Sequence, residues 1–184
     1  MAETVPDYVA FLRAINLGRI RPFPMAELRS CLEAAGFDGV ETYIQTGNVR
    51  LRTSMRSTDR VAARLERVFE ADRGFAVPAV VLTPAELRRV HEDALGLDLP
   101  VGGPAVRRYV TFLKQPAPPD VAEEIAAIET EGEAARAIGR AVHVWVQEGY
   151  RNARTNNARL ERRLGPATTR DLKVVGTLAE RWGA

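Results

Sequence analysis

The chain contains few of the residues that form disulfide bonds or bind metal ions. Cysteine occurs once in 184 residues, at Cys31, which excludes an intramolecular disulfide and makes a reducing compartment the default. We expect Cys31 to be a buried, inert thiol on an apolar helix face. The two histidines, His91 and His143, have no Cys or His neighbour at ligand spacing, so we predict no metal site.

Long apolar runs are missing as well. No stretch approaches the roughly 20 residues of a membrane span, and the first residues lack the basic-then-apolar pattern of a secretory signal. We therefore predict a cytoplasmic protein without membrane contact. The chain also lacks a glycine-rich phosphate loop, a zinc-protease helix motif and a nucleophile elbow, so we predict no cofactor and find no support for a hydrolase triad.

Lysine is scarce: Lys114 and Lys173 are the only two among 26 basic residues. Arginine, which carries the remaining positive charge, suits bidentate contact with phosphate or carboxylate. A GC-rich coding sequence explains the same bias without any function, and the net charge is only +2. With 46% apolar and 27% charged residues, the composition is that of a globular protein.

The chain does contain an internal sequence repeat. The heptapeptides DYVAFLR at 7–13 and RYVTFLK at 108–114 open two halves with the same order of patterns: strand, helix, strand, strand, helix, strand. This order is that of the ferredoxin-like plait. We predict an α+β fold made by tandem duplication of a βαββαβ plait, with a linking helix and a C-terminal helix. The predicted domains are 1–83 and 107–184, joined by the linking helix and loop 84–106.

Local signals agree with this order. Gly36 followed by Phe37 predicts a Schellman stop for the first helix, and Thr83 with Glu86 predicts a capping box for the linking helix. Further expected elements are a hairpin around Thr46-Gly47-Asn48, with its first strand at 42–45, a hairpin around Gly139-Arg140, helices near 120–130 and 153–164, a short edge strand, and a last helix reaching Trp182.

Polar residues and glycines gather at one end of the first plait. Because strands one and two of a plait run in the same direction, the loop after strand one and the tip of the following hairpin share one end of the sheet. Guanidinium, amide and glycine groups there can bind a phosphate, a carboxylate or a nucleobase edge. The predicted ligand-binding residues are Arg13, Asn16, Gly18, Gln45, Gly47 and Asn48, with Arg19 and Arg21 beside them. A structural alternative stays open, in which the asparagines hold turns and Gln45 fastens the loop to the hairpin.

The second half offers an aromatic strand face and a basic segment. His143 and Trp145 alternate with valines and so share one face of a strand, which we expect Tyr109 to join. Such a face can stack nucleobases or pack against the other plait or a partner. Arginine dominates residues 149–173, which favours either phosphate binding or a solvated helix face. The residues of a nucleic-acid-binding alternative are Trp145, Arg154, Arg159, Arg163 and Arg170.

Three segments together resemble a known family: RAINLG at 13–18, PMAEL at 24–28 and YIQTGNV at 43–49. They are similar to the bacterial domain-of-unknown-function family numbered 1697, which typically opens LRGINVGG and has YIQSGN at the hairpin. The resemblance covers nearly the full chain and implies a soluble bacterial protein of two ferredoxin-like subdomains without an established activity. By position, the family's motif residues are Arg13, Asn16, Gly18, Gln45, Gly47 and Asn48.

The chain departs from that family pattern at four places. Alanine stands at Ala14, where glycine is usual, and Arg19 is a second departure. Ala153-Arg154 stands where the family tends to have Ser-Lys, and residues 171–174 stand where it has Asn-Trp-Asn-Thr. If the C-terminal motif carries the family's activity, these departures imply that this member has lost or altered it.

Four functions follow from the sequence. We favour binding of a small anionic or nucleotide-like ligand at loop 13–21 and hairpin 45–48. The alternatives are an enzyme using the same pocket, with Arg13 and Arg170 stabilising negative charge, a nucleic-acid-binding protein using residues 149–173, and a protein-interaction role. The sequence identifies no general base, and it predicts no oligomeric state.

Overall fold

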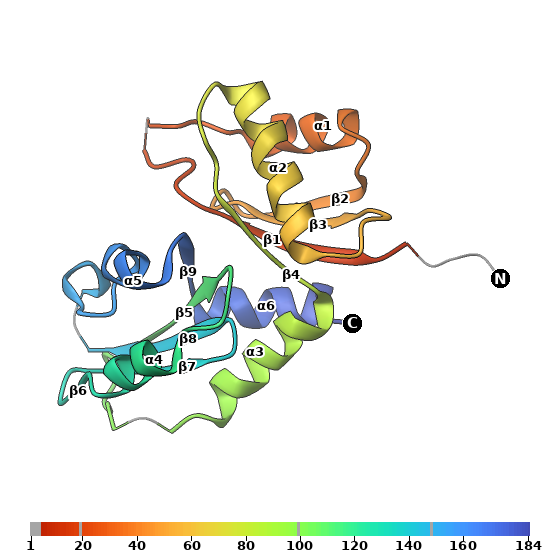
Figure 1. Ribbon diagram of the computed structural model, residues 1–184. Helices are drawn as coiled ribbons and strands as arrows, with labels where there is room; N and C mark the ends of the chain where they lie inside the picture. Colours follow the sequence, from red (N-terminus) through yellow and green to blue (C-terminus); the bar gives the residue numbers. More distant parts are fainter. Residues whose placement is uncertain (1–4, 19, 99, 148) are drawn as a thin grey trace. The chain divides into compact units, whose positions relative to one another are not determined.

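The computed structural model describes residues 5–18, 20–98, 100–147 and 149–184 (Figure 1). The chain divides into two compact units, the first reaching Leu87 and including Trp182–Ala184, the second formed by Arg88–Arg181. Both combine an antiparallel sheet with helices, so the chain has the α+β fold expected from its sequence. Within the described ranges, every helix is too short or too polar to span a bilayer.

The first unit is built on one sheet. Its elements are β1 (Asp7–Leu12), α1 (Met25–Ala34), β2 (Asp38–Tyr43), β3 (Asn48–Arg52), α2 (Thr58–Arg73) and β4 (Ala79–Leu82). The strands pair antiparallel in the order β2-β3-β1-β4, which is the order of a ferredoxin-like plait. Helices α1 and α2 cover one face of this sheet (Figure 1). Alternate residues of β1 (Tyr8, Ala10 and Leu12) meet apolar side chains of both helices in the core.

Helix ends in the first unit follow the sequence signals. Gly36 has φ 83° and ends α1, while the Phe37 N–H donates to the Leu32 carbonyl at 3.1 Å, which is the Schellman bond. The linking helix α3 (Pro84–Gly96) begins with the expected capping box. The Thr83 N–H donates to Glu86 at 2.8 Å, and the Glu86 N–H donates to the Thr83 hydroxyl at 3.2 Å.

The second unit repeats the strand order. Its elements after α3 are β5 (Arg107–Leu113), α4 (Pro119–Ala126), β6 (Glu129–Thr130), β7 (Glu133–Ile138), β8 (Ala141–Val146), a 3-10 turn (Tyr150–Asn152), α5 (Asn157–Leu164), β9 (Ala167–Asp171) and α6 (Leu172–Trp182). The sheet order is β6-β7-β8-β5-β9, so the second plait carries the short β6 as an added edge strand. The expected short edge strand is β9, at the opposite edge.

The two heptapeptides occupy equivalent places. The Leu12 N–H donates to the Gly47 carbonyl in the β2–β3 turn at 2.8 Å. The Leu113 N–H donates to the Arg140 carbonyl in the β7–β8 turn at 2.9 Å. Each first strand is therefore joined to its own hairpin by the same hydrogen bond, as a duplicated plait would have it.

Three expected element boundaries are wrong, each for a local reason. The helix expected near 120–130 ends at Ala126, because the residues after it pair with β7 as β6. The helix expected near 153–164 starts only at Asn157, where the Asn156 side chain accepts from the Arg159 N–H at 3.1 Å. Strand β2 ends at Tyr43, because Ile44 takes a positive φ of 50° and leaves the extended region.

The faces of the second sheet correct one expectation. Tyr109 is the cross-strand partner of Val144, and partners in an antiparallel pair point to the same face. Tyr109 therefore lies on the valine face, covered by α4 and α5, with its ring 4.5 Å from that of Tyr150. It does not join His143 and Trp145, which point to the opposite face.

On that opposite face, His143 is deeply buried. Its side chain is 1% exposed, and neither ring nitrogen has a hydrogen-bond partner among the described residues. Burial lowers the pKa of His143 from 6.5 to about 4; Asp93 opposes this shift and Arg108 adds to it. The imidazole is therefore neutral at pH 7 and lies buried inside the second unit.

The buried His143 predicts a pH-dependent stability. Because the folded pKa lies below the unfolded value, the unfolded state takes up the proton first, so stability is full above pH 7 and falls as the pH drops through 6.5 towards 4. The free energy of unfolding, measured in urea, should fall by about 2 kcal/mol between pH 7 and pH 5. His143→Leu removes the titrating group and should show a much smaller loss. An equal loss in wild type and variant would refute the assignment.

Candidate functional site

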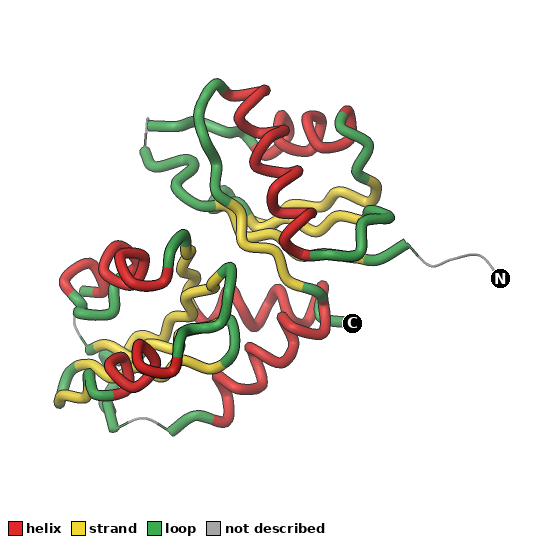
Figure 2. The backbone as a smooth tube through the Cα atoms, viewed as in Figure 1, coloured by secondary structure: helices red, strands yellow, loops and turns green. Residues whose placement is uncertain are grey.

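The side chain of Asn16 fastens the long loop after β1 to the β2–β3 turn. Figure 2 shows this segment, between β1 and α1, as irregular chain. The Asn16 Nδ2 donates to the carbonyl of Phe23 at 3.0 Å and to that of Gln45 at 2.8 Å. Its Oδ1 accepts from the Phe23 N–H at 2.7 Å. The carboxamide, which lies near the start of the loop, therefore bonds to Phe23 near the loop's end and to the turn, and brings the two predicted segments together.

Gly47 and Asn48 build the turn on which the loop rests. Gly47 has φ 79°, and a Cβ there would stand 2.8 Å from both Leu12 Cβ and Ile15 Cδ1. Only glycine fits this close approach. Asn48 is fully buried and donates to the Tyr43 carbonyl at 3.0 Å and the Thr46 hydroxyl at 3.1 Å. Both residues have structural contacts that account for their place in the motif.

Left-handed backbone conformations concentrate at this end of the sheet. Ala14, Asn16, Arg21 and Ile44 have φ values of 56°, 53°, 54° and 50°. A β-branched residue such as Ile44 is rarely found there, and each such residue costs on the order of 1–3 kcal/mol. Glycine, which the resemblance noted above led us to expect at position 14, would adopt the conformation of Ala14 without strain.

Arg21 and Phe23 attach the far end of the loop to the segment around the end of α2. Arg21 donates to the Ala76 carbonyl, and its guanidinium lies 4.8 Å from the Phe75 ring. The Phe23 ring meets that of Phe69 edge-on at 5.4 Å. Arg21 thus serves the loop's attachment and is not available as a ligand-binding group.

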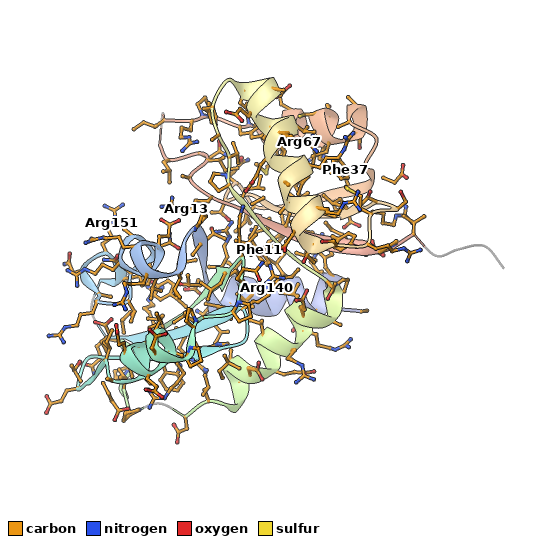
Figure 3. All side chains as sticks on the ribbon, viewed as in Figure 1. Phe11, Arg13, Phe37, Arg67, Arg140 and Arg151 are labelled. Atoms are coloured by element: carbon orange, nitrogen blue, oxygen red, sulfur yellow. The ribbon has the colours of Figure 1, made fainter. Side chains whose placement is uncertain are left out.

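The exposed surface of the loop and turn has mixed character. Gln45 is exposed, and its side-chain amide bonds to no described residue. Gly18 is exposed, and a Cβ there would meet nothing within 4 Å. Arg13, labelled in Figure 3, follows β1 and is half-buried. Leu17, Ile20 and Ile44 are 57%, 67% and 42% exposed. We call this set the loop–hairpin surface: Arg13, Leu17, Gly18, Ile20, Ile44 and Gln45.

Comparison with known proteins identifies the family. A family model described as a protein of unknown function, DUF1697, matches residues 5–143, which include the loop and the turn. The chain belongs to the DUF1697 family. A structure of the conserved bacterial protein SP0830 from Streptococcus pneumoniae aligns over 98% of this chain and 100% of its own, with a TM-score of 0.70. At 20% identity, that likeness shows a shared fold. No curated protein matches this DUF1697 chain.

The basic residues of the nucleic-acid alternative do not form one patch. Arg154, Arg159 and Arg163 line a cavity of about 380 Å³ beside α4 and α5. Within it, Arg163 is paired with Glu124 through two contacts of 2.5 and 3.0 Å, so part of the positive charge is neutralised. Trp145 lies elsewhere, half-buried beneath the Arg108 guanidinium at 4.2 Å.

Arg170 is an internal residue of this DUF1697 protein. Its side chain is 7% exposed and donates to the Thr168 hydroxyl at 2.7 Å and the Thr169 carbonyl at 2.9 Å. Burial lowers its pKa to about 10, which still leaves it charged at pH 7. Sequence reasoning missed this burial because Arg170 lies on a short strand in an otherwise basic, exposed segment.

The described residues offer little to metal or thiol chemistry. No cluster of three or more His, Cys, Asp or Glu side chains in the described ranges is arranged to hold a metal ion. Cys31 is half-buried, where a buried thiol was expected, and packs against the core of the first unit. Burial, with Asp72 nearby, raises the pKa of this thiol, which disfavours the nucleophilic thiolate.

Two glycine substitutions test the turn. Gly47→Ala should destabilise the protein by about 2–4 kcal/mol, because the new methyl group meets Leu12 and Ile15 in a left-handed residue. Gly18→Ala is the matched control: it also has a positive φ but open space around it, and should cost only about 1 kcal/mol. The measurement is the free energy of unfolding in urea. If both variants lost the same amount, the left-handed backbone conformation, and not close packing, would be the reason for glycine at position 47.

Proposed function

We propose that this DUF1697 protein binds a small anionic, nucleotide-like molecule on the loop–hairpin surface. The observation that carries the proposal is the set of three hydrogen bonds of the Asn16 carboxamide. They hold in one place a loop whose residues occupy costly left-handed conformations. A surface fixed before binding loses little conformational entropy when a ligand arrives.

The chemistry of the surface suits a ligand with two parts. The Arg13 guanidinium provides a fork of donors for a phosphate or carboxylate. The exposed amide of Gln45 can both donate and accept, as a nucleobase edge requires. Leu17, Ile20 and Ile44 offer apolar contact for a base or sugar. A nucleoside monophosphate combines these chemical features in one small molecule.

The other functions have less support. The nucleic-acid alternative relied on Trp145, Arg154, Arg159, Arg163 and Arg170. Of these, Trp145 is stacked under Arg108, Arg163 is paired with Glu124, and Arg170 is buried. The enzyme alternative joined Arg13 with Arg170, which belong to different units. The enzyme alternative therefore remains a prediction, and the sequence identifies no general base that would support it.

Binding of AMP measured by titration calorimetry tests the proposal. Arg13→Gln should weaken binding roughly tenfold or more, because a charge-assisted hydrogen bond contributes about 1.5–3 kcal/mol. Gln45→Ala should weaken it by roughly threefold, as a neutral hydrogen bond contributes about 0.5–1.5 kcal/mol. Arg67→Gln, which removes an exposed arginine from α2, is the control and should bind as wild type.

Thermal unfolding of the unliganded variants separates binding from structure. The melting temperature of Gln45→Ala should match the wild type, because this side chain bonds to no described residue. The proposal fails if neither AMP nor another nucleoside monophosphate binds at millimolar concentration. It also fails if Arg13→Gln and Arg67→Gln weaken binding equally.

A further inference from the structure

A cavity of about 590 Å³ in the second unit gathers basic side chains. The residues that line it include His91, Arg107, Arg108, Asp171, Lys173 and Gly176. They come from α3, from the start of β5, and from the junction between β9 and α6. On one wall, α3 and α6 approach closely: His91 Nε2 stands 3.1 Å from where a Cβ on Gly176 would be.

Arg108 is held in place and yet keeps an unused donor. Its guanidinium donates to the Ala94 carbonyl near the end of α3 and lies over the Trp145 ring. Its Nε is buried and has no hydrogen-bond partner in the described part of the chain. Burial lowers the pKa of Arg108, and no carboxylate opposes that shift. A buried donor without a partner calls for a ligand or a bound water.

The other basic groups of the cavity are also without counter-ions. Arg107 and Lys173 are exposed, and neither forms an ion pair within the residues that the structure describes. One carboxylate, Asp171, lines the cavity, and its Oδ1 accepts from the Lys173 N–H at 2.9 Å. Asp171 thereby caps α6, whose N-terminal turn adds partial positive charge. Three cationic side chains thus face one carboxylate.

We propose that this cavity is a second binding site, for a small molecule that carries a phosphate or diphosphate group. Guanidinium forks and a lysine ammonium are the usual partners of phosphate oxygens. The volume lies within the roughly 300–1,000 Å³ of small-molecule sites. The inference does not rest on the loop–hairpin surface, because every residue that carries it lies in the second unit.

Titration of the full chain with inorganic pyrophosphate tests this site. Lys173→Gln and Arg107→Gln should each weaken binding by roughly fivefold or more, since each removes one charge from the cavity. Asp171→Asn should tighten binding about twofold, because asparagine keeps the helix cap and removes the opposing charge. Arg162→Gln, an exposed arginine on α5 outside this cavity, should have no effect.

Competition separates small molecules from nucleic acid as the source of the phosphate. ADP should displace pyrophosphate, whereas adenosine and a single-stranded oligonucleotide without terminal phosphates should not. The proposal is overturned if pyrophosphate does not bind at up to about 10 mM, a concentration tenfold above that needed for a millimolar dissociation constant. It is also overturned if Arg162→Gln weakens binding as much as Lys173→Gln, or if the oligonucleotide displaces pyrophosphate. Arg13→Gln, which should weaken AMP binding at the loop–hairpin surface, should leave pyrophosphate binding unchanged.

Discussion

The Asn16 carboxamide is the interaction on which the first unit's candidate site depends. It satisfies two carbonyls and one N–H that would otherwise lack partners in the irregular loop. These three bonds contribute about 0.5–1.5 kcal/mol each, which is the same order as the cost of the left-handed residues around them. Together with the packing of Ile15 against Gly47, this side chain keeps the loop and the turn in one relative position.

The family motif therefore contains residues of two kinds. Asn16, Gly47 and Asn48 build the loop and its support through buried hydrogen bonds and close packing. Gln45 and Gly18 remain exposed, and Arg13 is half-buried beside them. The structural alternative considered from the sequence thus accounts for part of the motif, although Asn16, and not the Gln45 side chain, fastens the loop. For the exposed amide of Gln45, a ligand gives a reason, whereas Gly18 also has a conformational one in its φ of 61°.

The second unit shares the strand order but not this device. Its hairpin is joined to β5 by the Leu113 bond, the counterpart of the Leu12 bond in the first unit. The chain between β5 and α4 is short and contains Pro116 and Pro118, with no asparagine to tie it to the β7–β8 turn. Its unpartnered basic groups lie instead around the start of β5 and of α6. Two copies of one architecture thus present different chemistry at different places.

Patterns that act locally were predictable, and long-range burial was not. The plait order, the Schellman stop at Gly36 and the capping box at Thr83 depend on neighbours in the sequence and agree with the structure. The meeting of loop and turn followed from strand direction alone. The burial of Arg170 and the face of Tyr109 depend on strand register across the sheet, which the sequence does not show. The cavity at Arg108 joins three distant elements, and no single segment signals it.

A nuclear magnetic resonance titration of the isotope-labelled protein with AMP tests the central claim most directly. Within the first unit, a surface that is fixed before binding predicts shifts confined to the amides of the loop after β1 and the turn before β3, with one saturating curve for those amides and unchanged signals in that unit's core. Shifts spread over the core of that unit, or their absence from the loop and turn, would contradict a preformed site there.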